Sequence, residues 1–110
     1  MSRPVAIIAL DNTLVRVGKR GPVKLKAAHV MNIAAAATFV QFFDAADAAD
    51  ITLGTTVPDY VLGAAIASPS NQADLVDLLF GKGLFVAATT TAGGLTAPSV
   101  GVPASFSFDD

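Results

Sequence analysis

Several residue types are absent from this chain or rare in it, and each absence removes a class of function. There is no cysteine, which excludes disulfides, thiolate chemistry and cysteine-based zinc sites. Tryptophan and glutamate are also absent, so all nine acidic residues are aspartate. Because aspartate forms helices poorly and turns well, this acidic set favours strands and loops over helices.

Charge is scarce as well. Only 15% of the residues are charged and 53% are hydrophobic, against about 25% and roughly 45–50% in average globular domains. Much of the apolar excess is alanine, which fills a core poorly, so we expect a partner to cover part of the surface. The chain has 110 residues, which suits a single domain with one modest core.

The few basic residues are concentrated at one end. Six of the seven lie within the first 26 residues, where Asp11 is the only acid, and the net charge of the whole chain is −2. No aromatic residues alternate with them, as they would in a segment that binds single-stranded nucleic acid. The longest apolar stretch, residues 30–43, is shorter than the about 20 residues of a membrane span. We expect neither nucleic acid nor a membrane as partner.

Period-two alternation is the clearest structural signal. Over residues 23–33 it predicts a strand whose apolar face holds Val23, Leu25, Ala27, His29, Met31 and Ile33. The same alternation from Val100 to Phe108 predicts a strand over 100–108. Density of β-branched and aromatic residues predicts further strands near 37–43, 57–63 and 84–91.

Two segments leave alternatives open. Residues 32–50, with their alanine run, could instead form a helix. Residues 73–80 could be a strand or one helical turn, and the polar cluster 68–72 is typical of a turn. Short strands separated by turns about every ten residues predict an all-β fold. We therefore expect an antiparallel β-sandwich or jelly-roll-like single domain with an N-terminal extension.

Residues 1–22 have two interpretations, whereas residues 23–110 form the sandwich domain in both. Residues 2–20 could be a basic arm, hinged at residues 18–22, that contacts a neighbouring subunit. Residues 5–17 could instead be the first hairpin of the domain's own sheet. Under the first interpretation the interface residues are Val5, Ile7, Ile8, Leu10, Arg16 and Arg20.

The motifs that suggest chemistry have simpler structural explanations. Residues 7–15 resemble the first motif of haloacid-dehalogenase-like phosphatases, a strand followed by DxDGTL. Ala9 stands where that family has its nucleophile, so only Asp11 matches and a turn at Asp11-Asn12 is the better interpretation. The aspartates of residues 44–50 lack EF-hand spacing, and His29 has no nucleophile in a recognisable motif with it. We predict no catalytic, cofactor-binding or metal-binding residues and no enzyme.

One resemblance indicates a function. Residues 37–46 (ATFVQFFDAA), 51–58 (ITLGTTVP) and 81–91 (GKGLFVAATTT) resemble a group of small bacteriophage virion proteins. These proteins have, in order, a strand, an FDA-type loop, LGTTxP, a second strand, an xxGL segment and a strand ending in TTT. The resemblance implies a β-sandwich that decorates or cements a capsid, or is associated with a fibre. It therefore implies a structural virion protein at the surface of the phage head.

The partners expected from this resemblance are the major capsid protein and other copies of the chain, as a homotrimer or another symmetric homo-oligomer. One alternative is a tail, neck or fibre-base component. Another is a carbohydrate-binding β-sandwich, although the chain offers only Tyr60 and phenylalanines as aromatic platforms.

Overall fold

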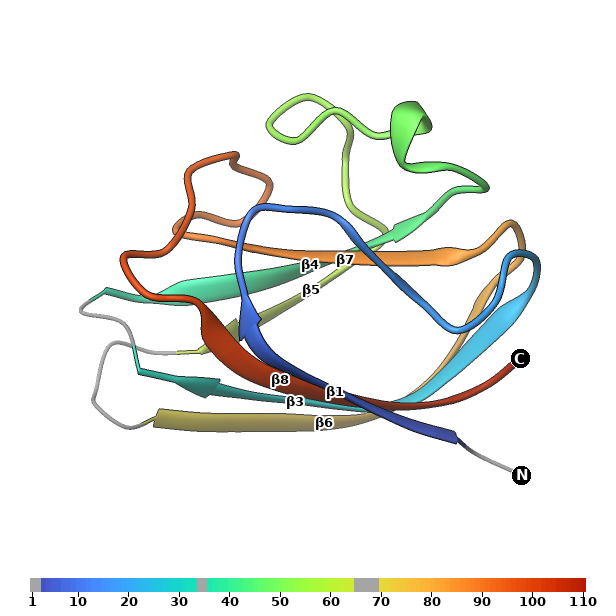
Figure 1. The fold of residues 1–110 in the computed structure, drawn as a ribbon, viewed down its shortest axis with the longest axis horizontal. Coiled ribbons are helices and arrows are strands. Elements are labelled where there is room, and N and C mark those ends of the chain that lie inside the picture. Colours follow the sequence, from blue (N-terminus) through green and yellow to red (C-terminus); the bar gives the residue numbers. More distant parts are fainter. Residues whose placement is uncertain (1–2, 34–35, 65–69) are drawn as a thin grey trace.

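The chain folds as an all-β sandwich in a computed structural model that describes residues 3–33, 36–64 and 70–110, with only the backbone for 70–76. Among these residues, eight strands form two antiparallel four-stranded sheets (Figure 1). Sheet I contains, in spatial order, β1 (Arg3–Leu10), β8 (Val102–Asp109), β3 (Val23–Asn32) and β6 (Ser70–Phe80). Sheet II contains β2 (Val15–Val17), β7 (Leu84–Thr89), β4 (Thr38–Asp44) and β5 (Tyr60–Ala64). A short 3-10 helix, Ala48–Asp50, lies between β4 and β5.

The strand order is that of a jelly roll. Strand β1 pairs with β8, β2 with β7, β3 with β6 and β4 with β5. The chain is therefore one long antiparallel hairpin that is folded over on itself. Two further pairings, β3 with β8 and β4 with β7, join the halves of this hairpin into the two sheets. The structure confirms the predicted fold class, an antiparallel β-sandwich of jelly-roll type.

The main core lies between the sheets. Phe42 of β4 contacts both Tyr60, at 5.4 Å between ring centroids, and Phe106 of the opposite sheet, at 5.6 Å in an edge-to-face arrangement. Edge-to-face packing of this kind adds about 0.5–1.5 kcal/mol to the free energy gained by burying the rings. Strand β8 supplies every second residue to the core, from Val102 to Phe108, as the period-two pattern predicts.

All five strands predicted near 23–33, 37–43, 57–63, 84–91 and 100–108 are present, with ends shifted by up to three residues. The alternative helix over 32–50 is wrong, because residues 38–44 form β4. Of the predicted turn at 68–72, residues 68–69 lie outside the described residues and residues 70–72 belong to β6. Strand β6 also settles the choice left open for residues 73–80 in favour of a strand.

The predicted apolar face of residues 23–33 is correct only for its first half. Val23 and Leu25 are fully buried, but beyond them Ala28 and Val30 point inward and His29 lies on the outer face. The register shifts between residues 25 and 27 in the pairings of β3 with both neighbours. An extra residue in a strand reverses which side chains face the core, because side chains alternate with period two.

The described part of the N-terminal segment, residues 3–22, belongs to the domain's own sheets. Strand β1 pairs with β8 in sheet I, and β2 pairs with β7 in sheet II. The two strands therefore do not form a hairpin with one another. Nor do they extend away from the domain, since both pair with strands of the same chain.

Candidate functional site

The outer face of sheet II is covered by loops of the same chain. Phe43 and Phe85 point outward from β4 and β7 and pack against Ala45 and Ile51, forming a second hydrophobic cluster. Leu53 of the β4–β5 loop also packs against it. Strand β7 is consequently buried on both faces over its whole length. Figure 1 shows the loops above β4 and β7, on the side away from sheet I.

Side-chain hydrogen bonds hold two of these loops in place. Gln41 of β4 is fully buried, and its Nε2 donates to Thr89 Oγ1 at 2.7 Å and to the Gly94 carbonyl at 2.9 Å. Asn12 Nδ2 donates to the Leu95 carbonyl at 3.1 Å. The β7–β8 loop is therefore attached both to the sheet beneath it and to the β1–β2 loop beside it.

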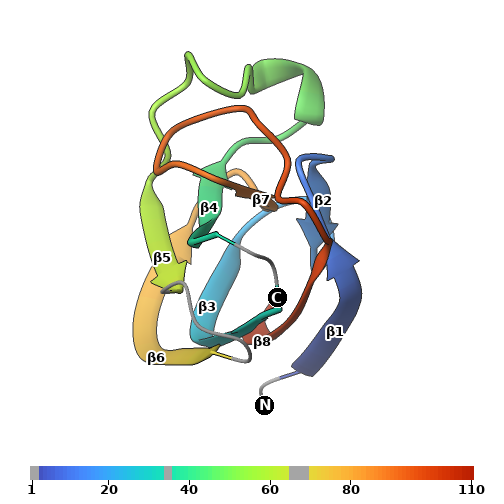
Figure 2. The same ribbon diagram turned by 90° about the vertical axis from the view of Figure 1, so that its left-hand side faces the viewer.

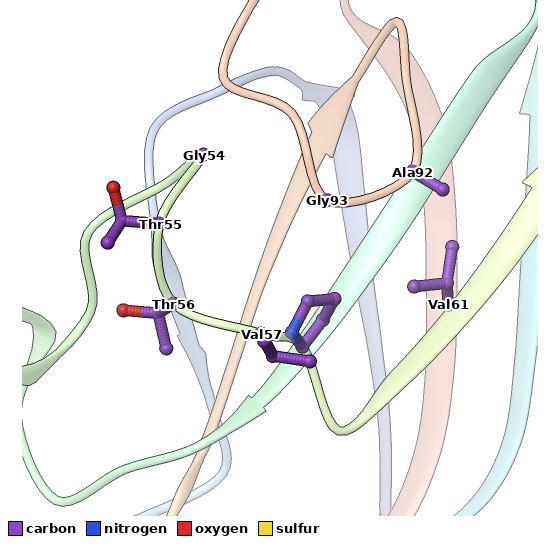
Figure 3. A pocket seen from close by; sticks show the side chains of 8 residues that line it. Gly54, Thr55, Thr56, Val57, Val61, Ala92 and Gly93 are labelled. Carbon is purple, nitrogen blue, oxygen red and sulfur yellow. The ribbon is translucent and has the colours of Figure 1, made fainter.

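A pocket of about 420 Å³ opens between the β4–β5 and β7–β8 loops (Figure 3). We call it the loop pocket. At Gly54 the backbone has φ +85°, and an added Cβ would lie 2.7 Å from Leu95 Cδ2, so only glycine allows the two loops to come this close. The loop pocket is lined by Gly54, Thr55, Thr56, Val57, Pro58, Val61, Ala92 and Gly93.

The loop pocket is uncharged and mostly apolar. Thr55 and Thr56 point away from Ala92 and Val61, which lie across from them (Figure 3). Thr56 Oγ1 already accepts a hydrogen bond from the backbone N–H of Thr52 at 2.9 Å. None of the eight lining residues has an ionisable side chain or an aromatic ring. The pocket therefore offers no acid or base for catalysis and no ring on which a sugar could stack, but it can accept an apolar side chain.

The apolar residues of the predicted interface separate into different environments. Leu10 is part of the main core at 1% exposure, and Val5 and Ile7 are half-buried against that core. Ile8 points outward from β1 and is 86% exposed. The structure therefore does not bring these four residues together as one contact surface.

The two arginines predicted at the interface interact with their own chain. The Arg16 guanidinium lies 4.6 Å from the centre of the Phe85 ring and donates to the Ala46 carbonyl at 3.0 Å. Arg20 donates to Asp47 Oδ2 at 3.1 Å. A cation over an aromatic ring is favourable by about 0.5–2 kcal/mol, so Arg16 has a local role in covering the second cluster.

Other N-terminal basic residues are paired in the same way. Arg3 contacts Asp110 at 2.9 Å, while Lys24 and Lys26 lie 3.5 and 2.9 Å from Asp77. The predicted attraction between a basic arm and an acidic body thus operates within one molecule. Long-range steering of a neighbour would require charge that the chain leaves uncompensated.

Asp110 joins three separate parts of the chain. Its carboxylate accepts hydrogen bonds from Arg3 Nη1 and from the backbone N–H of Lys19 at 3.1 Å. Burial alone would raise the pKa of Asp110, but the hydrogen bonds from Lys19 and Arg3 and the charges of both residues together hold this pKa below its usual value. The carboxylate therefore links the start of β1, the β2–β3 turn and the C-terminal end.

The remaining candidate residues have structural partners. Asp11 Oδ1 accepts from the backbone N–H of Thr13 at 2.9 Å, which is the predicted turn. Asp44 accepts from the N–H groups of Gly81 and Lys82, whereas Asp47 pairs with Arg20, so these two carboxylates have different protein partners. Among the described residues, no three histidine or aspartate side chains gather around a possible metal position.

Two further observations concern the whole chain. Within the part of it that the structure describes, no helix has the length and apolar character needed to cross a membrane. Comparison with protein-family models, with curated proteins and with solved structures found no match. The fold and the described surfaces are therefore the basis for a functional proposal.

The sequence contained a partial signal for the loop pocket. Five of its eight lining residues, 54–58, lie in the segment 51–58 that carries the virion resemblance. That segment predicted a strand start at residue 57, whereas β5 begins at Tyr60. Proximity of residues 92 and 93 to this segment could not be predicted, because it depends on how β7 and β4 pair.

Proposed function

We propose that this protein is a structural component of a bacteriophage virion, a capsid decoration protein that binds the major capsid protein at the surface of the phage head. The observation that carries the proposal is the loop pocket. An uncharged apolar cavity beside exposed hydrophobic side chains suits a protein partner better than a substrate that needs acid–base chemistry.

The rim of the pocket supports this proposal. Val57 is 82% exposed and Leu95 is 59% exposed. Both lie on the loops that form the pocket, one of which contains the segment 51–58 of the virion resemblance. Loops positioned by a rigid sheet commonly carry binding function. In protein interfaces a few residues packed in pockets supply most of the binding free energy, and an aliphatic side chain can be such an anchor.

The fold is also compatible with this role. Jelly rolls occur in viral capsid domains, and also in lectins and cupins, so the fold alone does not select among these functions. The loop pocket discriminates against a lectin, since its lining has no aromatic ring. A coat surface that inserts an aliphatic side chain would match both its volume and its lack of charge.

Binding to phage capsids tests the proposal. Purified protein should co-sediment with shells of the major capsid protein, and Val57→Asp should weaken this binding at least about tenfold, as loss of an interface anchor does. The charge would be placed in an apolar contact, while the high exposure of residue 57 leaves the fold intact. Val100→Asp, at a residue that is 49% exposed and does not line the loop pocket, is the control and should bind shells as the wild-type protein does.

If the protein does not bind shells but binds tail, neck or fibre components, its role would be that of another virion component and not of a decoration protein. Retention on immobilised oligosaccharides, with no affinity for any virion protein, would overturn the proposal altogether.

A further inference from the structure

The outer face of sheet I differs from that of sheet II because none of the described loops covers it (Figures 1 and 2). We call it the open face. The strand registers align its side chains in rows across β1, β8 and β3, such as Ala6, Ser105 and His29. Away from the end of the face that holds Lys24 and Lys26, the side chains of these three strands that point outward are Pro4, Ala6, Ile8, Ala27, His29, Met31, Pro103, Ser105 and Ser107.

Short side chains on the central strand create a groove in the open face. Pro103 and Ser105 of β8 form its floor, with Ile8 on one side and His29 and Met31 on the other. The groove has a volume of about 250 Å³, equal to roughly eight water molecules at about 30 Å³ each. It is therefore large enough for the four side-chain carbons of an isoleucine.

A side chain that fits this groove projects from the same face. Ile8 is the most exposed of the large hydrophobic residues in the described part of the chain. A surface that carries both a projecting apolar residue and an adjacent groove can be complementary to itself. A two-fold axis produces this relation, since each copy then contributes the same patch to the contact.

Charge on the open face does not oppose such a contact. Around the groove, none of the outward residues of β1, β8 and β3 is ionisable except His29. Lys24 and Lys26 lie at one end of the face, where both are paired with Asp77 of the same chain. A second copy would therefore bury a centre in which His29 is the one ionisable side chain on these three strands, and depletion of charged residues is typical of interface cores.

The face is also large enough. The molecule measures 35 × 30 × 19 Å, and the strands run along the longest axis while neighbouring strands lie side by side along the shortest (Figures 1 and 2). The open face is therefore at most about 35 × 19 Å, or roughly 650 Å², so a contact that covers all of it on both copies would bury about 1,300 Å² in total. This is within the about 1,200–2,000 Å² of specific protein interfaces.

From these observations we infer that the open face is the contact surface for a second copy of this chain. The two copies pack sheet to sheet about a two-fold axis, and Ile8 of each enters the groove of the other. This inference goes beyond the proposed coat binding and does not depend on it, because the loop pocket lies on the opposite side of the sandwich. A two-fold dimer could present two loop pockets to a shell at once, which would strengthen attachment by tethering.

Sedimentation equilibrium of the full chain is the direct test. The wild-type protein should behave as a species of twice 11.1 kDa that dissociates on dilution. Ile8→Asp should shift the equilibrium toward monomer by at least about tenfold in dissociation constant, whereas Val57→Asp should leave it unchanged. Ser105→Tyr fills the floor of the groove without adding charge and should also weaken the dimer, which guards against an effect of charge alone.

A mixing experiment adds information on symmetry. Ile8 lines the groove that receives Ile8 of the second copy, so the two side chains are neighbours across the axis. Ile8→Asp and Ile8→Lys should each be monomeric alone, and an equimolar mixture should associate. The inference would be overturned if the wild-type protein were a monomer or a trimer. It would also be overturned if neither Ile8→Asp nor Ser105→Tyr changed the dissociation constant of the dimer. If Ile8→Asp abolishes the dimer while the variant still binds shells, the dimer inference holds independently of the proposed function.

Discussion

Sheet II and sheet I bury their inner faces in the same core, yet their outer faces differ. Phe43 and Phe85 project from the outer face of sheet II and are covered by loops, so that both are less than 5% exposed. Short side chains such as Ser105 occupy the centre of the outer face of sheet I, and Ile8 at its edge is exposed. The β4–β5 and β7–β8 loops leave the sandwich from opposite ends, and both lie over sheet II (Figure 1).

This difference explains how the many apolar residues of the chain are distributed between the two sheets and their loops. The long β4–β5 loop contributes Ile51 and Leu53 to the second cluster, and together with the β7–β8 loop it forms the loop pocket. The strands of sheet I contribute apolar residues to one core only and leave a flat, weakly charged surface. In the isolated chain the two sheets should therefore respond differently to equivalent substitutions.

The largest expected effect is loss of the second cluster. Phe43→Ala would leave a cavity beneath the loops and should lower the free energy of unfolding by about 3–5 kcal/mol. Phe43 is 1% exposed in the cluster with Ile51 and Phe85. Met31→Ala removes a large side chain from the open face, where it is only half-buried, and should cost less than about 1 kcal/mol.

Urea denaturation of both variants measures this contrast, at a protein concentration low enough to keep the chain monomeric. Equal losses would mean that loops do not protect the outer face of sheet II from water. A Met31→Ala variant less stable than Phe43→Ala would reverse the comparison between the sheets.

A smaller effect is expected where the covering loop is attached. Gln41→Leu preserves the buried volume but leaves the Gly94 carbonyl without its Gln41 donor, so stability should fall by about 1–3 kcal/mol. Amide exchange in residues 90–96 should accelerate, because the loop loses its attachment to β4. Asn12→Ala removes an exposed hydrogen bond to the same loop and should have a weaker effect. Unchanged exchange in Gln41→Leu would show that packing alone holds the loop.

Much of the fold could be predicted because alternation and β-branched density are local signals. Strand β8 alternates without interruption, and its inward residues from Val102 to Phe108 were all identified correctly. Strand β6 was recognised only in part, since Ser70, Asn71 and Gln72 are typical turn residues that the pairing with β3 holds in a strand. Tertiary pairing there overrides local preference.

The register shift in β3 shows a different limit. A period-two pattern placed His29 toward the core, and a single irregularity between residues 25 and 27 turned it outward. No residue in that stretch is typical of a bulge, so sequence could not indicate it. The open-face groove, of which His29 forms one side, was missed for this reason.

The concentration of basic residues could be seen in the sequence, but their partners within the chain could not. Basic residues do concentrate near the N-terminus, but their partners come from distant positions such as Asp77 and Asp110. These pairs form because β1 lies beside β8 and β3 beside β6. Which opposite charges meet within a chain depends on topology, and topology is the feature that the sequence constrains least.

The smallest expected effects concern these ion pairs, and they distinguish a carboxylate at a junction from one on the open face. The folded-state pKa of Asp110 is held below its usual value of about 3.9. A depressed pKa contributes stability that is present above about pH 4 and is lost as the pH falls through the folded-state value. Asp110→Asn should therefore reduce the difference in melting temperature between pH 7 and pH 2.5.

Asp77 provides the matched control on sheet I. Its hydrogen bond from Lys26 is the main cause of a lowered pKa, and the charges of Lys24 and Lys26 lower it further. Like Asp110, Asp77 therefore stabilises the folded state above about pH 4, and this contribution is lost as the pH falls through its folded-state pKa. However, Asp77 is 63% exposed, whereas the Asp110 side chain is 4% exposed and joins three segments. Solvent and salt screen an exposed pair, so Asp77→Asn should change the acid-induced shift in melting temperature less than Asp110→Asn does. Melting curves at both pH values, repeated in 1 M salt, measure this; a larger effect at Asp77 would show that the open face depends on its ion pairs more than the junction of the termini does.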